Sequence, residues 1–198
     1  MKRITFLFIL LIGSSSFGQQ VFKQKKSLLG SPFEISVVAN DSVQADFYTE
    51  LAISELKRIE NLISDWIPTT QISLVNQNAG ITPVKVDKEV FELVDRAMKI
   101  SKLTDGAFDI SYASMDKIWK FDGSMKSMPT AETIKKSVEK VGYQNIILNE
   151  KDTTIFLKNQ GMKLGLGGIG QGYIADKIKE LLIANGCNAG LVNVSGDI

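Results

Sequence analysis

The sequence contains no histidine and only one cysteine among its 198 residues. The lack of histidine excludes a Ser-His-Asp triad, a histidine-ligated zinc site and a histidine general base within these residues. The single thiol, Cys187, cannot form a disulfide bond within the chain. Charges of opposite sign nearly cancel, with 23 basic and 22 acidic residues, so no nucleic-acid-binding face is expected. The composition, 44% hydrophobic, is that of a globular protein, and the chain is long enough to form a substantial core.

The first 18 residues, MKRITFLFILLIGSSSFG, are typical of a secretory signal peptide. Lys2 and Arg3 precede a largely apolar stretch at 4–12, and small residues follow it. A membrane anchor is the alternative, but about nine to ten apolar residues are too few to cross a bilayer. We therefore expect an exported protein, periplasmic or associated with the cell envelope, with one domain at 19–198. Cys187 lies too far from the signal to carry a lipid, so a lipoprotein is not expected.

Apolar periodicity predicts four helices, at residues 43–66, 87–106, 130–142 and 171–185. Strand-like runs occur at 33–39, 145–148, 153–157, 162–166 and 189–194, and the turn 158–161 predicts a β-hairpin over 155–166. This mixture favours an α+β fold of mixed hairpins and packed helices over an alternating parallel sheet. Because the chain stops soon after a strand-like run, we expect it to be truncated at its C-terminus, with partner strands downstream. The run KQKK at 23–26 is expected to be a solvated tail.

The segment KLGLGGIGQGYIAD, at 163–176, places Gly165, Gly167 and Gly170 in a G-x-G-x-x-G pattern before a predicted helix. Such a segment suits a phosphate, because glycines let the phosphate come close to the backbone and the first amide groups of the helix point at it. A dinucleotide-binding fold is one interpretation, with Asp197 as the ribose partner. However, that pattern normally opens its domain, and here further glycines follow it. A purely structural role, tight packing of strand on helix, is the other alternative.

The wider pattern resembles the FAD:protein FMN transferase family, also called the ApbE or flavin transferase family and formerly the thiamine biosynthesis lipoproteins. LGGIGQGYIAD is similar to the family's L-G-G-I-A-K-G-Y-x-x-D block. Other blocks follow the family's order: LGSPFEI at 29–35, SDWIPTTQISLVN at 64–76, TDGAFDIS at 104–111, VGYQNIIL at 141–148 and NVSGDI at 193–198. The resemblance covers nearly all of 19–198, as the N-terminal part of the family's domain, and it implies the ApbE-like fold.

The resemblance implies a magnesium-dependent transferase. Such an enzyme moves FMN from FAD onto a Ser or Thr hydroxyl of a target redox flavoprotein, at or near a membrane, and releases AMP. A pyrophosphate needs backbone donors and a cation to neutralise its developing charge, which the glycines and Mg²⁺ would provide. An FAD pyrophosphatase, with water as the acceptor, and a non-catalytic FAD-binding or scavenging protein remain alternatives. Neither the target protein nor the oligomeric state is predicted.

The resemblance also implies site residues: the carbonyl of Gly168 is expected to bind magnesium, and FAD is expected to contact Leu29, Trp66, Ala107, Phe108, Asp109, Gly165 and Gln171. Three of these have structural alternatives. Leu29, which stands where the family usually has Met, is also a residue that could only pack; Trp66 is also the last apolar residue of the first predicted helix; and Asp109 is also a turn or cap residue. The sequence departs from the family where an acid is usual at 165 and a charged residue at 171. No catalytic residue is predicted. The family's histidine and its later magnesium ligands would lie beyond residue 198, so these residues alone are expected to bind FAD weakly and not to transfer FMN.

Overall fold

The computed structural model describes residues 18–120 and 122–198. The predicted signal peptide lies outside the described residues except for Gly18. Among the helices of the described part, none is long and apolar enough to span a membrane.

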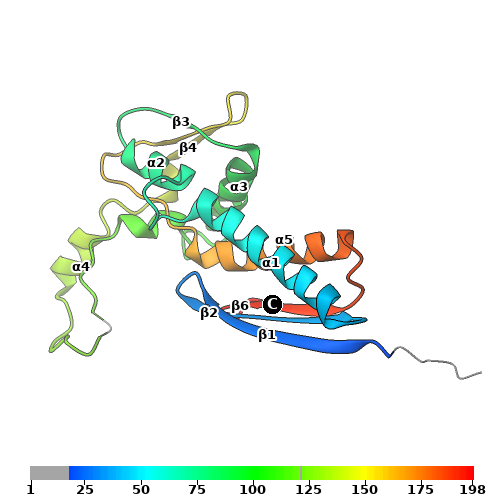
Figure 1. Cartoon of the computed structure of the whole chain (residues 1–198). Coiled ribbons are helices and arrows are strands. Elements are labelled where there is room, and N and C mark those ends of the chain that lie inside the picture. Colours follow the sequence, from blue (N-terminus) through cyan, green and yellow to red (C-terminus); the bar gives the residue numbers. More distant parts are fainter. Residues whose placement is uncertain (1–17, 121) are drawn as a thin grey trace, which may run out of the picture.

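A three-stranded antiparallel sheet forms one side of the molecule, with strand order β1-β2-β6. Its strands are β1 (Gln20–Leu28), β2 (Ser31–Ala39) and β6 (Gly190–Val194). The inward positions of β2, which alternate along the strand, are almost fully buried: Phe33, Ile35, Val37 and Ala39. Helices α1 (Ser42–Ile63) and α5 (Gly167–Ala184) pack on each other and cover that face (Figure 1). The core therefore lies between this sheet and the two long helices.

A second antiparallel sheet, of order β3-β5-β4, lies beyond the far end of α1. It contains β3 (Val84–Lys85), β4 (Ile146–Asn149) and β5 (Thr154–Leu157), and it is accompanied by α2 (Gln71–Gln77) and α3 (Lys88–Leu103). Every strand pair among the described residues is antiparallel. The predicted α+β class is confirmed, and the parallel sheet of a dinucleotide-binding fold is not present in this part of the chain.

None of the four predicted helices has the expected bounds at both ends, and α3 (Lys88–Leu103) ends three residues before the expected position 106. The first ends at Ile63, three residues before Trp66. The third, α4 (Ala131–Ser137), is capped as predicted by Thr130, whose hydroxyl accepts from Thr133 N, but it stops well before Gly142. The fourth begins at Gly167 instead of 171, so most of the glycines are helical. Helix α3 begins at its Asp87 cap as expected, and α2 was not predicted.

The predicted strand at 162–166, and with it the hairpin at 155–166, is wrong. Burial alternates only over 162–164, where Met162 and Leu164 are fully buried and Lys163 is exposed, since Gly165 and Leu166 are both buried, and the segment pairs with no strand of the described residues. Side chains hold its backbone instead: Asn76 Oδ1 accepts from Leu164 N at 2.7 Å, and Ser114 Oγ accepts from Lys163 N at 2.8 Å. The strand-like run is therefore a largely buried segment outside the sheets, while β5 pairs with β4 and β3.

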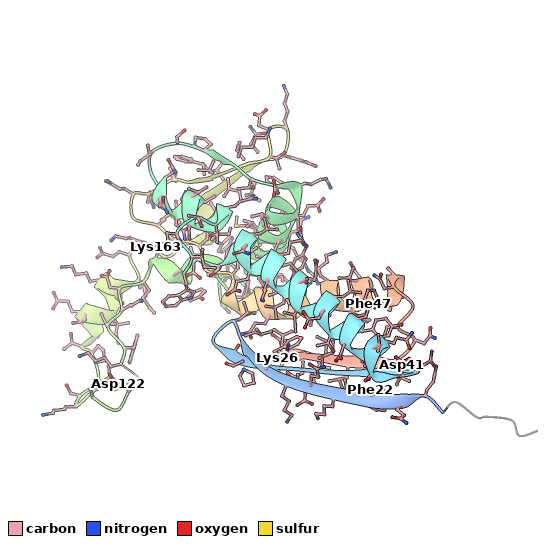
Figure 2. The ribbon with its side chains drawn as sticks, in the orientation of Figure 1. Phe22, Lys26, Asp41, Phe47, Asp122 and Lys163 are labelled. Carbon is pink, nitrogen blue, oxygen red and sulfur yellow. The ribbon has the colours of Figure 1, made fainter. Side chains whose placement is uncertain are left out.

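The run at 23–26, predicted to be a tail, lies in the middle of β1. Its side chains are exposed or partly exposed, as expected, but Glu34 on β2 pairs with Lys23 and, at 2.9 Å, with Lys25. Figure 2 shows Phe22 and Lys26 along this strand, with Asp41 and Phe47 near one end of α1. At the other end of the molecule, Lys163 lies near the segment that carries α4 and Asp122, which projects from the body.

Candidate functional site

The glycine segment, defined here as residues 165–172, forms the entry into α5 and its first turn. Leu166 is the N-cap residue, and no side chain of the described residues caps this end. Gly167 and Gly168 are exposed, and the first inward hydrogen bonds come only from Ile169 N and Gly170 N, which donate to Leu166 O. An 18-residue helix whose first amides face solvent carries partial positive charge at that end. It is suited to an anion such as phosphate.

Two hollows lie beside this helix end, and they share Asp65 and Trp66. The first, of about 490 Å³, is lined by residues from the β1–β2 turn, the end of α1 and the start of α5: Leu29, Gly30, Glu60, Ile63, Ser64, Asp65, Trp66, Ile67, Leu166, Gly167, Gly170, Gln171 and Ile174. The second, of about 930 Å³, is lined by Asp65, Trp66, Pro68, Ser73, Asn76, Gln77, Tyr112, Ala113, Met115, Asp116, Lys117, Trp119 and Lys163. Both volumes are in the range of small-molecule sites.

Trp66 separates the two hollows. Because α1 ends at Ile63 and the indole is 79% exposed, Trp66 is not the last core residue of that helix, and this alternative is wrong. Lys117 Nζ lies 4.9 Å from the centre of the indole ring, in a cation–π arrangement. A large exposed aromatic ring at the boundary of two hollows is suited to stack on a flat ligand ring.

The structure brings three of the predicted FAD contacts together in the first hollow: Leu29, Trp66 and Gln171. Leu29 and Gly30 form the two-residue turn between β1 and β2, with φ values of 56° and 68°. This is the left-handed region that leucine rarely occupies, and paired positive φ values suit a tight hairpin. The turn presents Leu29 to the hollow at the cost of some backbone strain.

Ala107, Phe108 and Asp109 follow α3, and of the three Phe108 lies against the glycine segment. A Cβ on Gly168 would lie 3.3 Å from Phe108 Cε2, so the phenyl ring packs on the first turn of α5. Asp109 precedes the short 3₁₀ helix η1 (Ile110–Ser114): its Oδ1 accepts from Ser111 N and Oγ, and its Oδ2 accepts from Tyr143 N at 2.8 Å. Asp109 is therefore a cap residue, and its contact with FAD stays a prediction.

Gly165 is buried and has no space for a side chain. A Cβ at this position would lie 3.0 Å from Ala113 Cβ and 3.0 Å from both Cζ and Oη of Tyr112. Its amide donates to Ile110 O at 2.8 Å. Any contact that Gly165 makes with a ligand is through its backbone. The side chain of Tyr112 fills the space instead. The sequence did not indicate Tyr112, because it lies far from Gly165 along the chain and only the fold brings the two residues together.

The described residues do not fit a complete magnesium site. No group of three or more Asp, Glu, Cys or His residues is placed to hold a metal ion in this part of the chain. Gly168 lies in the first turn of α5, where a carbonyl points along the helix towards its C-terminal end. One backbone carbonyl provides a single ligand of the six that Mg²⁺ usually takes. The magnesium role of Gly168 stays a prediction.

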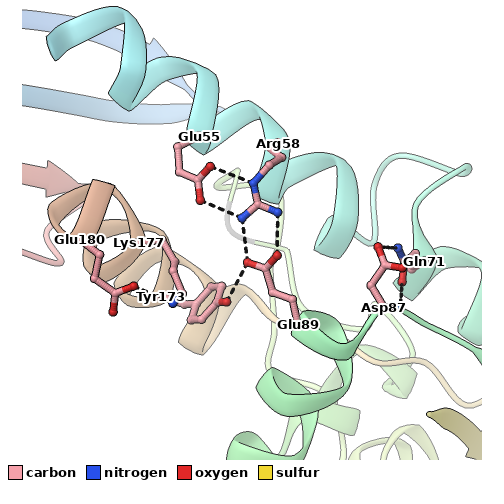
Figure 3. A network of polar contacts seen from close by, with 8 residues as sticks. All are labelled: Glu55, Arg58, Gln71, Asp87, Glu89, Tyr173, Lys177 and Glu180. Carbon is pink, nitrogen blue, oxygen red and sulfur yellow. Dashed lines mark hydrogen bonds and ion pairs between the residues drawn. The ribbon is translucent and has the colours of Figure 1, made fainter. Parts of the chain in front are cut away.

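A polar network fixes the next turn of α5 to the other long helices (Figure 3). Arg58 on α1 donates to Glu55 through Nε and Nη2, each at 2.8 Å, and to both oxygens of Glu89 on α3, at 2.6 and 2.8 Å. Tyr173 on α5 donates to Glu89 Oε1 at 2.8 Å. The hydrogen bonds from Arg58 and then Tyr173 lower the pKa of Glu89. Burial and the bond to Glu89 raise the pKa of Tyr173.

Curated proteins similar to this chain in sequence are FAD:protein FMN transferases. The chain is 30% identical over 179 residues to a FAD:protein FMN transferase of Klebsiella pneumoniae, covering 90% of this chain and 55% of the relative. It is 25% identical to one of Treponema pallidum, covering 99% and 57%. The chain thus spans about half the length of these curated relatives.

Solved structures show the same fold. The ApbE protein from Thermotoga maritima matches with a TM-score of 0.72 and 26% identity, over 83% of this chain and 53% of that one. The flavin transferase ApbE from Vibrio cholerae matches with a TM-score of 0.78 over 90% of this chain and 58% of that one, and at 18% identity this likeness shows the fold alone. The model of the ApbE family matches residues 29–198, which include both hollows and the glycine segment, and the chain therefore belongs to the ApbE family.

Proposed function

We propose that this chain provides the FAD-binding part of an FAD:protein FMN transferase. The observation that carries the proposal is the pair of hollows that share Asp65 and Trp66: the start of α5 lines the first, and Tyr112, whose hydroxyl lies against the glycine segment, lines the second. FAD consists of two ring systems joined through a pyrophosphate. A ligand of this shape would place its charged centre at the helix end and one ring system in each hollow. The names of the relatives reported above support the same assignment.

In the proposed reaction, the oxygen of an acceptor Ser or Thr hydroxyl attacks the phosphorus on the FMN side of the pyrophosphate. A new P–O bond forms, the bond from that phosphorus to the bridging oxygen breaks, and AMP leaves with the electron pair. The hydroxyl proton passes to solvent or to a base that we do not assign. The amides of Gly167 and Gly168, at the positive end of α5, would hold the phosphate oxygens and stabilise their charge.

We further propose that Mg²⁺ is required and that the target is a redox flavoprotein at or near a membrane. When bound, Mg²⁺ supplies a positive charge that neutralises the pyrophosphate oxygens. Residues beyond the described set would have to complete its coordination, because this part of the chain offers no group of three acidic or other candidate ligands. We also propose export to the periplasm or cell envelope, from the signal-like sequence at 1–18.

The test is a titration of the purified chain with FAD and NADH, followed by flavin and nicotinamide fluorescence, and an assay of AMP release with and without Mg²⁺. We expect FAD to bind in preference to NADH. A preference for NADH, or no binding of FAD, contradicts the proposal. The same assay applied to a protein that includes further family residues after Ile198 is expected to release AMP and to label an acceptor protein with FMN.

FAD binding without transfer is the second candidate, and the lack of a metal-binding group in the described residues favours it for this chain taken alone. AMP release by these 198 residues in the presence of Mg²⁺ would exclude it. Release of AMP and free FMN without labelling of an acceptor would instead indicate an FAD pyrophosphatase.

A further inference from the structure

Tyr112 lies against the backbone of the glycine segment. Its side chain projects from η1 so that Oη is 3.0 Å from the position a Cβ would take on Gly165 and 3.4 Å from the corresponding position on Gly167. Gly167 lines the first hollow, whereas Tyr112 itself lines the second. The phenol hydroxyl is therefore at the boundary of the two hollows, beside the first amides of α5.

This hydroxyl is available to a ligand. Among the described residues no hydrogen-bond partner is found for Tyr112 Oη, and the side chain is 49% exposed. Partial burial of the phenol, and then the negative charge of Asp65, raise its pKa. At neutral pH the group is thus an O–H that can donate, with no negative charge to repel an anion.

The charges around the second hollow allow an anion to approach. Lys117 and Lys163 line it together with Asp65 and Asp116, so the acidic side chains are matched by two ammonium groups. In the described part of the chain neither lysine forms an ion pair with an acidic side chain.

We propose that Tyr112 is a substrate-binding residue whose hydroxyl donates a hydrogen bond to a phosphate oxygen of FAD. The proposal rests on the proposed function above and names one further contact of that site. Gly165 has no side chain to offer a polar contact and no space for one, and the Tyr112 hydroxyl is the polar group that lies at that place, 3.0 Å from the position of a Cβ. A donor held beside the first amides of α5 would add to the hydrogen bonds that fix the phosphates.

The test compares Tyr112→Phe with the unaltered chain by fluorescence titration with FAD and with riboflavin, which has the flavin ring and no phosphate. The variant removes only the hydroxyl. We expect its affinity for FAD to fall about tenfold, because a hydrogen bond to a charged group is lost. Its affinity for riboflavin should not change. Tyr173→Phe is the matched control: it removes the same atom from a tyrosine that bonds to Glu89, and its FAD affinity should stay within about twofold of the unaltered chain.

Two outcomes overturn the inference while leaving the proposed function intact. FAD affinity unchanged in Tyr112→Phe would show that the hydroxyl does not bind the phosphates. An equal loss of affinity for FAD and riboflavin would show that Tyr112 contacts the ring or shapes the hollow. Failure of the unaltered chain to bind FAD at all overturns both proposals, and the titration of that chain separates this case from the other two.

Discussion

Two tyrosines border the start of α5, and they use the same hydroxyl group in opposite ways. Tyr173 donates to Glu89 within a network that links three helices. Tyr112, beside the glycine segment, has no partner among the described residues and faces a hollow. Both phenols have a raised pKa, so this property does not separate them. The difference lies in the neighbours: the Tyr173 hydroxyl bonds to Glu89, whereas the Tyr112 hydroxyl has no such bond among the described residues, as the proposed contact with FAD requires.

The contrast extends to the rest of the structure. Among the described residues, no buried side-chain nitrogen or oxygen lacks a hydrogen-bond partner. Polar groups without partners are therefore confined to exposed places, where water or a ligand can satisfy them. Those around Trp66 and the N-terminus of α5 occur together with two hollows, which is why they indicate a binding site.

The largest predicted effect comes from placing a side chain at position 165, where the side chain of Tyr112 already fills the space. Gly165→Asp places a side chain where Tyr112 and Ala113 already lie within 3.0 Å of a Cβ. We expect a loss of about 1–3 kcal/mol in the free energy of unfolding, as for other overpacked positions. Urea denaturation measures it.

Gly172→Ala is the matched control on the same segment. A Cβ there would meet nothing closer than Asp197 Cγ at 3.9 Å, so we expect no loss and a gain of up to about 1 kcal/mol from helix propensity. Adding Tyr112→Ala to Gly165→Asp should recover part of the lost stability. If Gly165→Asp is as stable as the unaltered chain, Tyr112 does not restrict position 165.

This comparison also shows where the sequence was informative. The amphipathic spacing in α1, α3 and α5 is local, and it predicted these helices to within a few residues. The strand-like run at 162–166 is largely buried, but the partners of its backbone, Asn76 and Ser114, are side chains from distant parts of the chain. No local pattern distinguishes such a segment from a strand.

The same limit applies to the site, because local sequence patterns do not reveal contacts between distant parts of the chain. The order of motifs indicated the residues of the first hollow, and three of the predicted contacts do meet there. The fit of Tyr112 over Gly165 depends on a tertiary contact between η1 and the entry to α5, which periodicity cannot reveal. The short helix α2 did leave a signal that was missed, since the Thr70 hydroxyl accepts from Ser73 N in the manner of an N-cap.

The second prediction concerns the network and its dependence on pH. The folded-state pKa of Glu89 is lowered from its ordinary value of 4.5, so its ionised form stabilises the fold above that value. The contribution is lost as the pH falls through the lowered folded-state pKa. Glu89→Gln should therefore cost about 1–2 kcal/mol at pH 7, and the difference from the unaltered chain should shrink steadily below about pH 4.5.

Unfolding by urea at pH 7, 5, 4 and 3 measures this difference. The control is Glu92→Gln on the same helix, where the acid pairs with Lys88 at an exposed position and, in the part of the chain that the structure describes, with no other base. Its cost should stay below about 0.5 kcal/mol at every pH, because exposed pairs contribute little. A difference for Glu89→Gln that is constant from pH 7 to pH 3 would show that the ionised carboxylate does not stabilise the fold.

The smallest predicted effect separates the two tyrosines directly. Tyr173→Phe removes a hydrogen bond to a carboxylate that Arg58 still holds, and it should lower the free energy of unfolding by about 0.5–1 kcal/mol. For a chain of this size that corresponds to about 1–4 °C in Tm. Tyr112→Phe should leave Tm unchanged, since its hydroxyl bonds to nothing in the described structure. Thermal unfolding followed by circular dichroism is the measurement. An equal loss of Tm in both variants would mean that Tyr112 Oη has an unrecognised partner in the fold, and the distinction between a structural and a ligand-binding tyrosine would fail.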